Sequence, residues 1–399
     1  ELSSYTIRSF GFAAGRSATQ YASDIASNNN STDPKPINDI MIALTNSYGF
    51  DHFGTAIDTE FDPNAGVDDP GLLAPKRPLF AGAYVEDRIT YKDLILNFGL
   101  RFDYFDTDNL TLLDPTRPEA AIDFATNKID PKGLTKTATF SAVSPRLGFS
   151  FPVTEQTVFH AQYGKFVQQS RLRDMYQGIY GLGTQLRGGF FISTPVGLDV
   201  RPTRTTQYEI GFTQQISDIA SFDITGYYKD IQDQVEFDIQ KVAAGSPYQS
   251  YNVLRNGDFA TTKGVEVSFN MRRVENIQAN ASISFQDAQG TGSNPNSKAG
   301  IVGAPLDGVT IFRPNYIAPL DFNKAITGNV NLDYRFAADN QSPILRELGL
   351  SALFSFDSGH PFTLGQGKGD SNGSLEGDNR FRSPIEALNS SSTPWVSQL

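Results

Sequence analysis

The residues best suited to binding chemistry lie in one glycine-rich segment, residues 171–191, where arginines alternate with a methionine and several aromatic residues. Aromatic rings stack on flat solutes and attract cations, so this combination suits sugars, peptides or an aromatic iron chelate. The alternative is a loop that folds onto its neighbours around an aromatic core. The candidate solute-binding residues are Arg171, Arg173, Tyr176, Tyr180, Arg187, Phe190 and Phe191.

Two other segments resemble cofactor motifs only in part. Gly181 and Gly183 begin a Gly-x-Gly sequence, but Leu186 occupies the third glycine position of a dinucleotide motif and no βαβ pattern surrounds it. The segment Asp370–Glu376 alternates oxygen ligands as a calcium loop does, yet Leu375 stands where such a loop needs glycine at its sharp turn. Ordinary loop chemistry explains the segment equally well, and the sequence predicts no cofactor.

Catalytic and metal-binding signatures are missing from the sequence. The three histidines, His52, His160 and His360, form no pair at helix or strand spacing, which argues against a zinc site. No Gly-x-Ser-x-Gly elbow is present, and the absence of cysteine excludes thiolate ligands and disulfides. The sequence therefore predicts that the protein is not an enzyme and holds no metal.

The elements that position these residues are two-faced strands. Between Leu94 and Tyr104 every second residue is leucine, phenylalanine or tyrosine, whereas the residues between them are mostly polar or small. Side chains of a strand alternate between its faces, so one face is apolar and the other polar. The same pattern recurs in hairpins, which gives about 11 or 12 strands. Strands or hairpins are expected over residues 5–12, 80–105, 140–151, 157–167, 206–232, 262–288 and 323–356, and residues 40–48 are ambiguous between strand and helix.

Very short turns alternate with very long connections between these strands. The long connections are rich in Gly, Pro, Asn, Asp and Ser, and they cover about residues 106–138, 168–204, 233–260, 289–321 and 365–392. Loops of this length argue against a compact soluble domain. They are expected in outer-membrane β-barrels, which present an apolar outer face to lipid and a polar inner face to a lumen. Aromatic residues near strand ends, among them Tyr227 and Tyr228, fit the girdles at the membrane surfaces.

Composition excludes several other classes of protein. No run of about 18 apolar residues is present, which excludes transmembrane helices. A formal net charge of −11 argues against nucleic-acid binding, which requires basic patches. The chain begins and ends in strand-like sequence without an initiator methionine or signal peptide, so we expect a piece of a longer protein.

Several strand motifs, taken in order, resemble TonB-dependent outer-membrane receptors. Among the branches of that family, the chain most resembles the large Oar-like receptors, which have an N-terminal carboxypeptidase-regulatory-like domain that would lie outside this chain. The matching segments are Gly82–Asp87 (GAYVED), Leu96–Asp103 (LNFGLRFD), Ser144–Phe151 (SPRLGFSF), Tyr163–Phe166 (YGKF), Gln207–Phe212 (QYEIGF), Thr262–Glu266 (TKGVE) and Ser358–Thr363 (SGHPFT).

The resemblance implies an all-β fold, a transmembrane antiparallel β-barrel with long extracellular loops in the outer membrane of a Gram-negative bacterium. Residues 1–399 would then be part of one barrel of 22 strands, and neither the plug nor the TonB-binding motif of the family is visible in the sequence. The implied partners are outer-membrane lipid and lipopolysaccharide, the TonB–ExbB–ExbD complex reached through the absent N-terminal region, and an accessory surface lipoprotein.

The expected function is import of a scarce, bulky solute by a TonB-dependent transporter. A passive porin-like channel, and a non-transporting barrel that acts as an adhesin or anchor, remain as alternatives. On the predicted lumen face the charged residues either contact plug and solute or pair across neighbouring strands. The residues expected to face the lumen are Arg101, Asp103, Arg146, His160 and Glu266.

Overall fold

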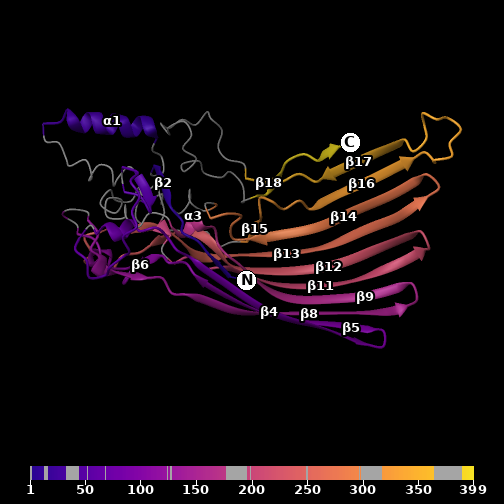
Figure 1. The fold of residues 1–399 in the computed structure, drawn as a ribbon, viewed down its shortest axis with the longest axis horizontal. Coiled ribbons are helices and arrows are strands. Elements are labelled where there is room, and N and C mark those ends of the chain that lie inside the picture. The colour runs from indigo at the N-terminus through magenta and orange to yellow at the C-terminus, as the bar shows by residue number, and fades with distance from the viewer. Residues whose placement is uncertain are drawn as a thin grey trace.

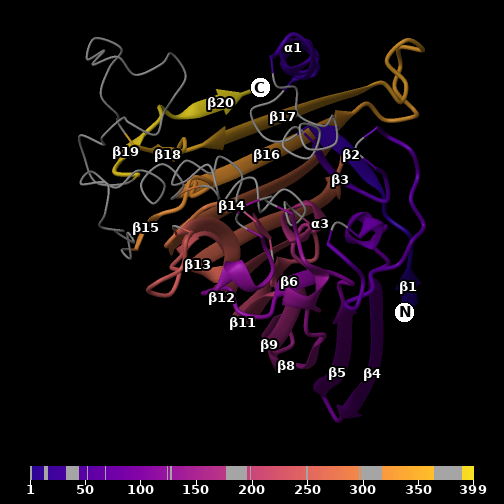
Figure 2. The same cartoon turned by 90° about the vertical axis from the view of Figure 1, so that its left-hand side faces the viewer.

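The computed structural model describes most of the chain: residues 2–12, 17–32, 45–51, 53–67, 69–123, 125, 128–176, 196–197, 199–248, 250–295, 297, 317–363 and 389–399. One large sheet dominates these residues (Figure 1). Its strands lie side by side in sequence order, with short turns at one end and long loops at the other. Viewed from the loop end, the strands follow an arc, and smaller elements lie on its concave side (Figure 2).

The sheet has 14 strands, of which 12 follow one another in a single path from β1 to β20. Along that path each neighbouring pair is antiparallel. Two short strands, β10 (Val196–Gly197) and β15 (Ala318–Pro319), pair with β13 and β14 beside the path. The path consists of β1 (Leu2–Ser4), β4 (Leu79–Tyr91), β5 (Leu94–Asp106), β8 (Phe140–Thr154), β9 (Thr157–Gln168), β11 (Thr203–Ser217), β12 (Ala220–Gln240), β13 (Tyr251–Val274), β14 (Ile277–Gly290), β16 (Ile326–Arg335), β17 (Gly349–Asp357) and β20 (Val396–Gln398).

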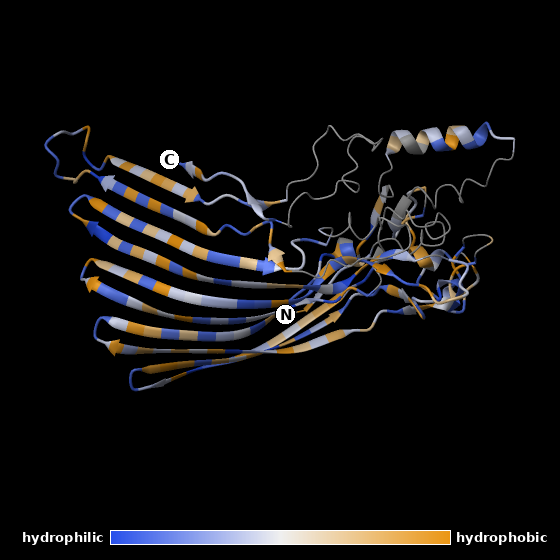
Figure 3. Ribbon diagram, turned by 180° about the vertical axis from the view of Figure 1, so that it is seen from behind, coloured by the Kyte–Doolittle hydropathy of each residue, from blue (hydrophilic) through white to orange (hydrophobic). Residues whose placement is uncertain are grey.

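The sheet has one apolar and one polar face, because alternate residues of each strand point to opposite sides. Residues directly opposite one another in an antiparallel pair share a face. The register Phe98–Leu147–Tyr163–Tyr208–Tyr228 therefore lies on one side, which we call the apolar face. The alternation of hydrophobic and hydrophilic residues is visible along the strands in Figure 3. The other side, which contains the register Ser150–His160–Gly211–Thr225–Glu266, is the polar face.

The aromatic pair Tyr227–Tyr228 is divided between these faces. Tyr228 lies on the apolar face opposite Tyr208, whereas the hydroxyl of Tyr227 is 3.2 Å from Gln286 Oε1 on the polar face. The prediction that both tyrosines belong to a membrane girdle is wrong for Tyr227, since consecutive residues of a strand point to opposite faces.

Strands β12 and β13 continue well beyond their neighbours at the loop end. The sequence predicted a long connection over residues 233–260, but only residues 241–250 join the two strands. The register shifts near Gln234, and Asp233 has a positive φ of 60°, so a β-bulge lies where a loop was expected to begin. Beyond the bulge the apolar residues Val235, Phe237 and Ile239 alternate with acidic ones, a strand pattern that the sequence does contain.

Smaller elements lie among the long loops. The expected strand over residues 5–12 is wrong in part: β2 covers only its last residues, and Ile7 forms an isolated bridge with Lys76. Within the ambiguous residues 40–48, strand β3 pairs with β2. These elements are β2 (Ser9–Phe12), α1 (Ala18–Asn29), β3 (Thr45–Tyr48), η1 (Pro70–Leu73), β6 (Leu110–Leu112), η2 (Pro118–Ala120), η3 (Pro131–Gly133), β7 (Leu134–Lys136), α3 (Leu172–Met175), β18 (Pro361–Phe362) and β19 (Ser391–Ser392). Among the described residues, no helix is both long and apolar enough to cross a membrane.

The loops pack against the extended β12–β13 hairpin in two apolar clusters. The first loop cluster joins Leu72 and the β6–β7 segment to Tyr248, Tyr251 and Val253. The second joins Met175, Tyr176 and Val200 to Val235, Phe237, Ile239 and Leu254. Burial of these side chains, each contributing about 1.5–3 kcal/mol, gives the loop end a hydrophobic core of its own.

Candidate functional site

All five residues predicted to face a lumen lie on the polar face. On β5, Arg101 and Asp103 alternate with Phe102, which is on the apolar face. Arg146 is opposite Gly99 and Gly164, and it shares the polar face of β8 with Ser150, the partner of His160. Glu266 follows in the same register three strands beyond His160.

Two of the cationic side chains are held by neighbours on this face. The Arg101 Nε donates to Asp103 Oδ1 at 2.8 Å, and Asp103 is buried. The Arg146 guanidinium lies 4.8 Å from the centroid of the Phe166 ring, a cation–π distance. Phe166 packs over Gly164, where an added Cβ would lie 2.9 Å from the ring. The arginines are thus oriented but still accessible from the polar side.

His160 belongs to a hydrogen-bonded network that crosses three strands. Its Nε2 is 3.1 Å from Thr225 Oγ1, and that hydroxyl donates to Asp223 Oδ1 at 3.0 Å. Because the Thr225 proton is used, His160 donates from Nε2 in this arrangement. The imidazole reaches across Gly211, where an added Cβ would lie 2.7 Å from Nε2. Glycine at position 211 therefore leaves room for the network.

Two of the cavities bordered by the described residues lie on the polar face. One of about 620 Å³ lies over β4 to β11 and is bordered by Arg88, Arg146, His160, Gln162 and Gln207. The other, of about 520 Å³, lies over β12 to β20 and includes Asp223, Glu266, Lys324 and Asp357. Amide, guanidinium and carboxylate groups line both, which suits a hydrated solute with many hydrogen-bonding groups. In the described ranges, no group of three or more His, Cys, Asp or Glu residues is arranged to hold a metal ion.

The predicted loop site is described only in part. Arg171 is exposed and precedes α3. Tyr176 is 5% exposed, its hydroxyl donates to the Thr107 carbonyl at 2.7 Å, and its ring lies 5.5 Å from that of Tyr48. Tyr176 is thus a packing residue of the second loop cluster, and its contact with solute stays a prediction. The Arg173 side chain, Tyr180, Arg187, Phe190, Phe191 and the segment 370–376 lie outside the described residues.

A buried lysine beneath Tyr176 was not singled out in the sequence. Lys76 is 6% exposed, and its Nζ lies 5.9 Å from the centroid of the Tyr176 ring. Burial lowers the pKa of Lys76 to about 8, although the Asp108 carboxylate opposes this decrease and Lys136 adds to it. Burial and Asp108 also raise the pKa of Tyr176, so its hydroxyl stays protonated. No spacing in the sequence marks Lys76, because its neighbours come from distant loops.

Asn109 joins separate segments of the loop end. Its Nδ2 donates to the carbonyl oxygens of Met175 at 2.6 Å and Gly197 at 3.2 Å, and the residue is 4% exposed. The Tyr251 hydroxyl similarly donates to the Pro115 carbonyl at 2.8 Å. Buried side-chain hydrogen bonds of this kind fix the loops relative to the large sheet as well as to each other.

Comparison with protein families identifies this architecture. Residues 2–384 match the family model described as "TonB dependent receptor-like, beta-barrel". The chain belongs to this family. Members of this family are outer-membrane β-barrels, and they are receptors and transporters rather than enzymes. The expected fold class, family and location are confirmed.

Solved structures of TonB-dependent receptors resemble the chain at low sequence identity. The FrpB iron transporter from Neisseria meningitidis (F3-3 variant) is 15% identical, with a TM-score of 0.45 over 72% of this chain and 34% of that one. The copper transporter OprC is 12% identical, with a TM-score of 0.45 over 81% and 39% of the two chains. The siderophore receptor PiuA from Acinetobacter baumannii is 13% identical, with a TM-score of 0.44 over 72% and 34%. The chain thus spans about a third of the length of these structures. No curated protein matches it.

Proposed function

We propose that this receptor segment forms part of the wall of an active transporter that imports a bulky solute across the outer membrane. The observation that supports this proposal is the continuous polar face, which bears charged and amide side chains across the sheet from β4 to β17. In a barrel whose apolar face contacts lipid, such a face lines the lumen. Arg101, Asp103, Arg146, His160 and Glu266 would then contact the solute or a plug domain.

The loop end would capture the solute before passage. Its two clusters hold the loops in one arrangement, so binding groups on the exposed surface are preorganised and lose little conformational entropy on binding. Arg171 is exposed beside this packed core and is the described residue of the predicted loop site that remains available to solute. A ferric siderophore, an oligosaccharide, a peptide or a cobalamin-like compound fits this description.

Energy would come from the TonB–ExbB–ExbD complex of the inner membrane, acting on a plug encoded outside these residues. This part of the proposal follows from family membership alone. An accessory surface lipoprotein would cover the loops.

Uptake by whole cells tests the proposal. Cells that produce the full-length protein and cells that lack it receive a defined mixture of ferric siderophores, cobalamin, oligopeptides and oligosaccharides. Mass spectrometry then follows loss of each compound from the medium. We expect at least one compound to disappear only with producing cells, and a protonophore to stop that loss. Loss that continues with the protonophore would indicate the passive channel, and no difference for any compound would indicate the adhesin or anchor.

An Arg171→Ala variant tests the loop contribution. Loss of one charge-assisted hydrogen bond, worth about 1.5–3 kcal/mol, is expected to weaken solute binding about 12- to 140-fold. Arg117→Ala, another exposed loop arginine, is the matched control. Equal affinities of the two variants for the transported compound would remove Arg171 from the binding site.

A further inference from the structure

The polar face carries a row of aromatic rings where it meets the loop end. Phe80 on β4, Phe105 on β5 and Phe140 on β8 are directly opposite one another. Phe105 is two residues beyond Asp103 on the same strand, so the row lies on the polar face between the charged residues and the long loops. Tyr5, which is 45% exposed, extends the row beside Phe80. Four aromatic residues therefore line the loop end of the proposed solute path.

The rings of this row touch one another without stacking flat. Their centroids lie 6.1 Å apart for Tyr5–Phe80, 5.6 Å for Phe80–Phe105 and 5.9 Å for Phe105–Phe140, and the ring planes are inclined by 44°, 64° and 58°. The three phenylalanines are half-buried. Each ring thus keeps an exposed part on which the apolar surface of a solute can pack.

The row ends at a cavity among the loops. Phe140 borders this cavity, whose volume is about 470 Å³. A volume of about 300–1,000 Å³ is typical of sites that bind small molecules. Most of the other side chains around it are polar, and they include Arg201, Arg204, Arg255, Asp233, Gln240 and Asn256.

Each of the three arginines in this cavity is paired with a carboxylate. The pairs are Arg201 with Asp199 (3.0 Å from Nη2 to Oδ2), Arg204 with Asp233, and Arg255 with the buried Asp238. A guanidinium has five N–H donors and a carboxylate accepts several hydrogen bonds, so each pair has further donors and acceptors to offer. Neighbouring hydroxyls of a neutral solute donate and accept at once and match such pairs. A solute of one charge would be repelled by one member of each pair.

Asn256 fixes the shape of the cavity. Its Nδ2 donates to the carbonyl oxygens of Arg201 at 2.9 Å and Asp233 at 2.6 Å, and its Oδ1 accepts from the Arg201 N–H at 2.7 Å. The bond from the Tyr251 hydroxyl to the Pro115 carbonyl joins two further residues of the lining. The cavity is therefore held in place by the protein itself, so little conformational entropy is lost when it binds a solute.

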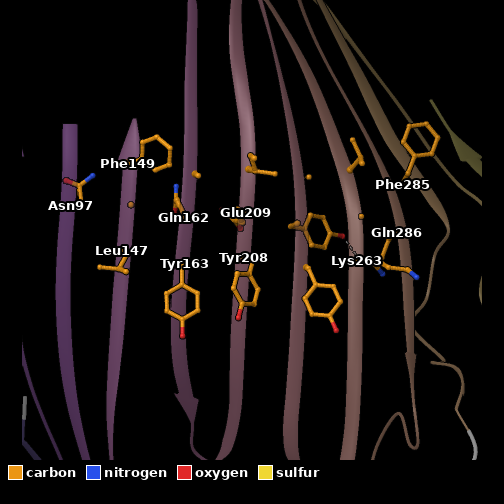
Figure 4. A pocket seen from close by; sticks show the side chains of 18 of the residues that line it. Asn97, Leu147, Phe149, Gln162, Tyr163, Tyr208, Glu209, Lys263, Phe285 and Gln286 are labelled. Carbon is orange, nitrogen blue, oxygen red and sulfur yellow. Dashed lines mark hydrogen bonds between the residues drawn. The ribbon is translucent and has the colours of Figure 1, made fainter. Parts of the chain in front are cut away.

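A larger groove, of about 1110 Å³, lies on the other side of the sheet. Figure 4 shows the side chains that border it, among them Phe149, Tyr163 and Tyr208. These residues are on the apolar face, which contacts lipid in a barrel of this kind, so a hydrated solute does not reach the groove. The aromatic row and the 470 Å³ cavity are the better candidates for contact with solute.

We infer that the aromatic row and the 470 Å³ cavity bind a neutral oligosaccharide. Its sugar rings would pack on Phe80, Phe105 and Phe140, and its hydroxyls would bond to the arginine–carboxylate pairs. A sugar ring has an apolar face and hydroxyls around its edge, and these residues complement both. The inference rests on the proposed function, because it names the class of solute that is imported.

Isothermal titration calorimetry of the purified full-length protein, in a detergent without a sugar headgroup, tests this inference. The neutral probes are maltohexaose, cellohexaose and mannohexaose, and hexagalacturonate is their charged counterpart. We expect at least one neutral hexasaccharide to bind, and to bind more tightly than hexagalacturonate.

Variants of the row and the cavity locate the binding. Phe105→Leu and Phe140→Leu keep an apolar side chain but remove the ring, and each should weaken binding about 2- to 13-fold. Phe102→Leu, on the apolar face of β5, is the matched control and should bind as wild type does. Arg201→Gln should weaken binding at least about 12-fold, whereas Arg77→Gln, which removes a loop arginine outside the cavity, should not. Assembly of each variant is checked by its shift in electrophoretic mobility on heating.

Three results would each overturn the inference: no neutral hexasaccharide binds to wild type, hexagalacturonate binds more tightly, or the row and cavity variants bind as wild type does. The wild-type comparison decides even if the variants fail to assemble. A neutral oligosaccharide that binds but is not taken up by cells would contradict the proposed transport and leave the inference standing. Energised uptake of a siderophore, without binding of any oligosaccharide, would do the reverse.

Discussion

Placing an arginine on the apolar face of β5 tests the assignment of the two faces. Leu100 is 51% exposed and lies between Val85 on β4 and Pro145 on β8, with no charged residue directly opposite. The apolar stretch of β5 extends from Leu94 to Tyr104, so Leu100 is close to its middle. Leu100→Arg therefore puts a guanidinium near the centre of the hydrocarbon layer.

The expected cost follows from depth and neighbours. Arginine at the midplane of a barrel's lipid face costs about 2–4 kcal/mol. This corresponds to about a 30- to 700-fold shift in the folding equilibrium. Phe98→Arg should cost less, since Asp87 is directly opposite and cross-strand opposite charges contribute about 0.2–1 kcal/mol. Asn97→Arg enters the polar face between Arg88 and Gly148 and should cost under about 1 kcal/mol.

The assay is equilibrium unfolding of the full-length protein in lipid vesicles, with heat-shifted electrophoretic mobility as the measure of the assembled fraction. Leu100→Arg should be the least stable variant, followed by Phe98→Arg, with Asn97→Arg close to wild type. Equal stabilities of Leu100→Arg and Asn97→Arg would refute the face assignment. A larger loss in Phe98→Arg than in Leu100→Arg would refute the role given to Asp87.

Three further predictions concern single packing features. Folding lowers the pKa of Lys76 from 10.5 to about 8, so the folded protein binds this proton less tightly than the unfolded chain does. The free energy of unfolding of the loop end should therefore increase by about 3 kcal/mol as the pH rises from 8 to 10.5. Hydrogen exchange, corrected for the intrinsic pH dependence of the exchange rate, measures this increase in stability. Lys76→Met should abolish the increase, and an increase that persists in the variant would contradict its attribution to Lys76. Asn109→Ala leaves two carbonyl groups without their donor and should raise the rate of hydrogen exchange in residues 172–176 by the equivalent of about 1–3 kcal/mol. Unchanged exchange would mean that the two Asn109 hydrogen bonds do not stabilise this segment. Gly164→Ala should lower the free energy of unfolding by about 1–3 kcal/mol, because its Cβ overpacks against Phe166, and adding Phe166→Leu should restore part of this loss. Gly148→Ala, whose Cβ would lie 3.7 Å from Asn97 Nδ2, is the control. Equal losses of stability at the two glycines would contradict this explanation.

Alternation along the strands was enough to predict the wall. The segment Leu94–Tyr104 shows why: a strand half-exposed to lipid repeats every two residues, and the register with neighbouring strands follows once the faces are fixed. Pairs such as Tyr227–Tyr228 show the limit of this approach, since aromatic composition near a strand end does not say which ring faces lipid.

The loop end could not be predicted, because its partners are far apart in sequence. Tyr176 has the residue type of a ligand contact, and only the positions of Thr107 and Tyr48 show that it is buried. The same holds for Lys76, whose pKa is lowered by burial among segments that are distant in sequence, against the opposing effect of Asp108. The extension of β12 was indicated in the sequence, because Val235, Phe237 and Ile239 alternate with polar residues. The bulge near Gln234 interrupts the alternation just before them, so the pattern indicated the end of the strand there.

The β12–β13 extension also constrains the order in which the protein assembles. The Tyr251 hydroxyl meets Pro115 across 136 residues of sequence, and the first loop cluster joins Leu72 to Tyr248 and Tyr251. Contacts so distant in sequence form only after the intervening chain has been brought together, which makes them late events in folding. The apolar side chains of the β6–β7 segment therefore stay exposed until β13 has paired with the sheet. An antibody specific for the packed loop end would accordingly recognise finished barrels and leave insertion intermediates unlabelled.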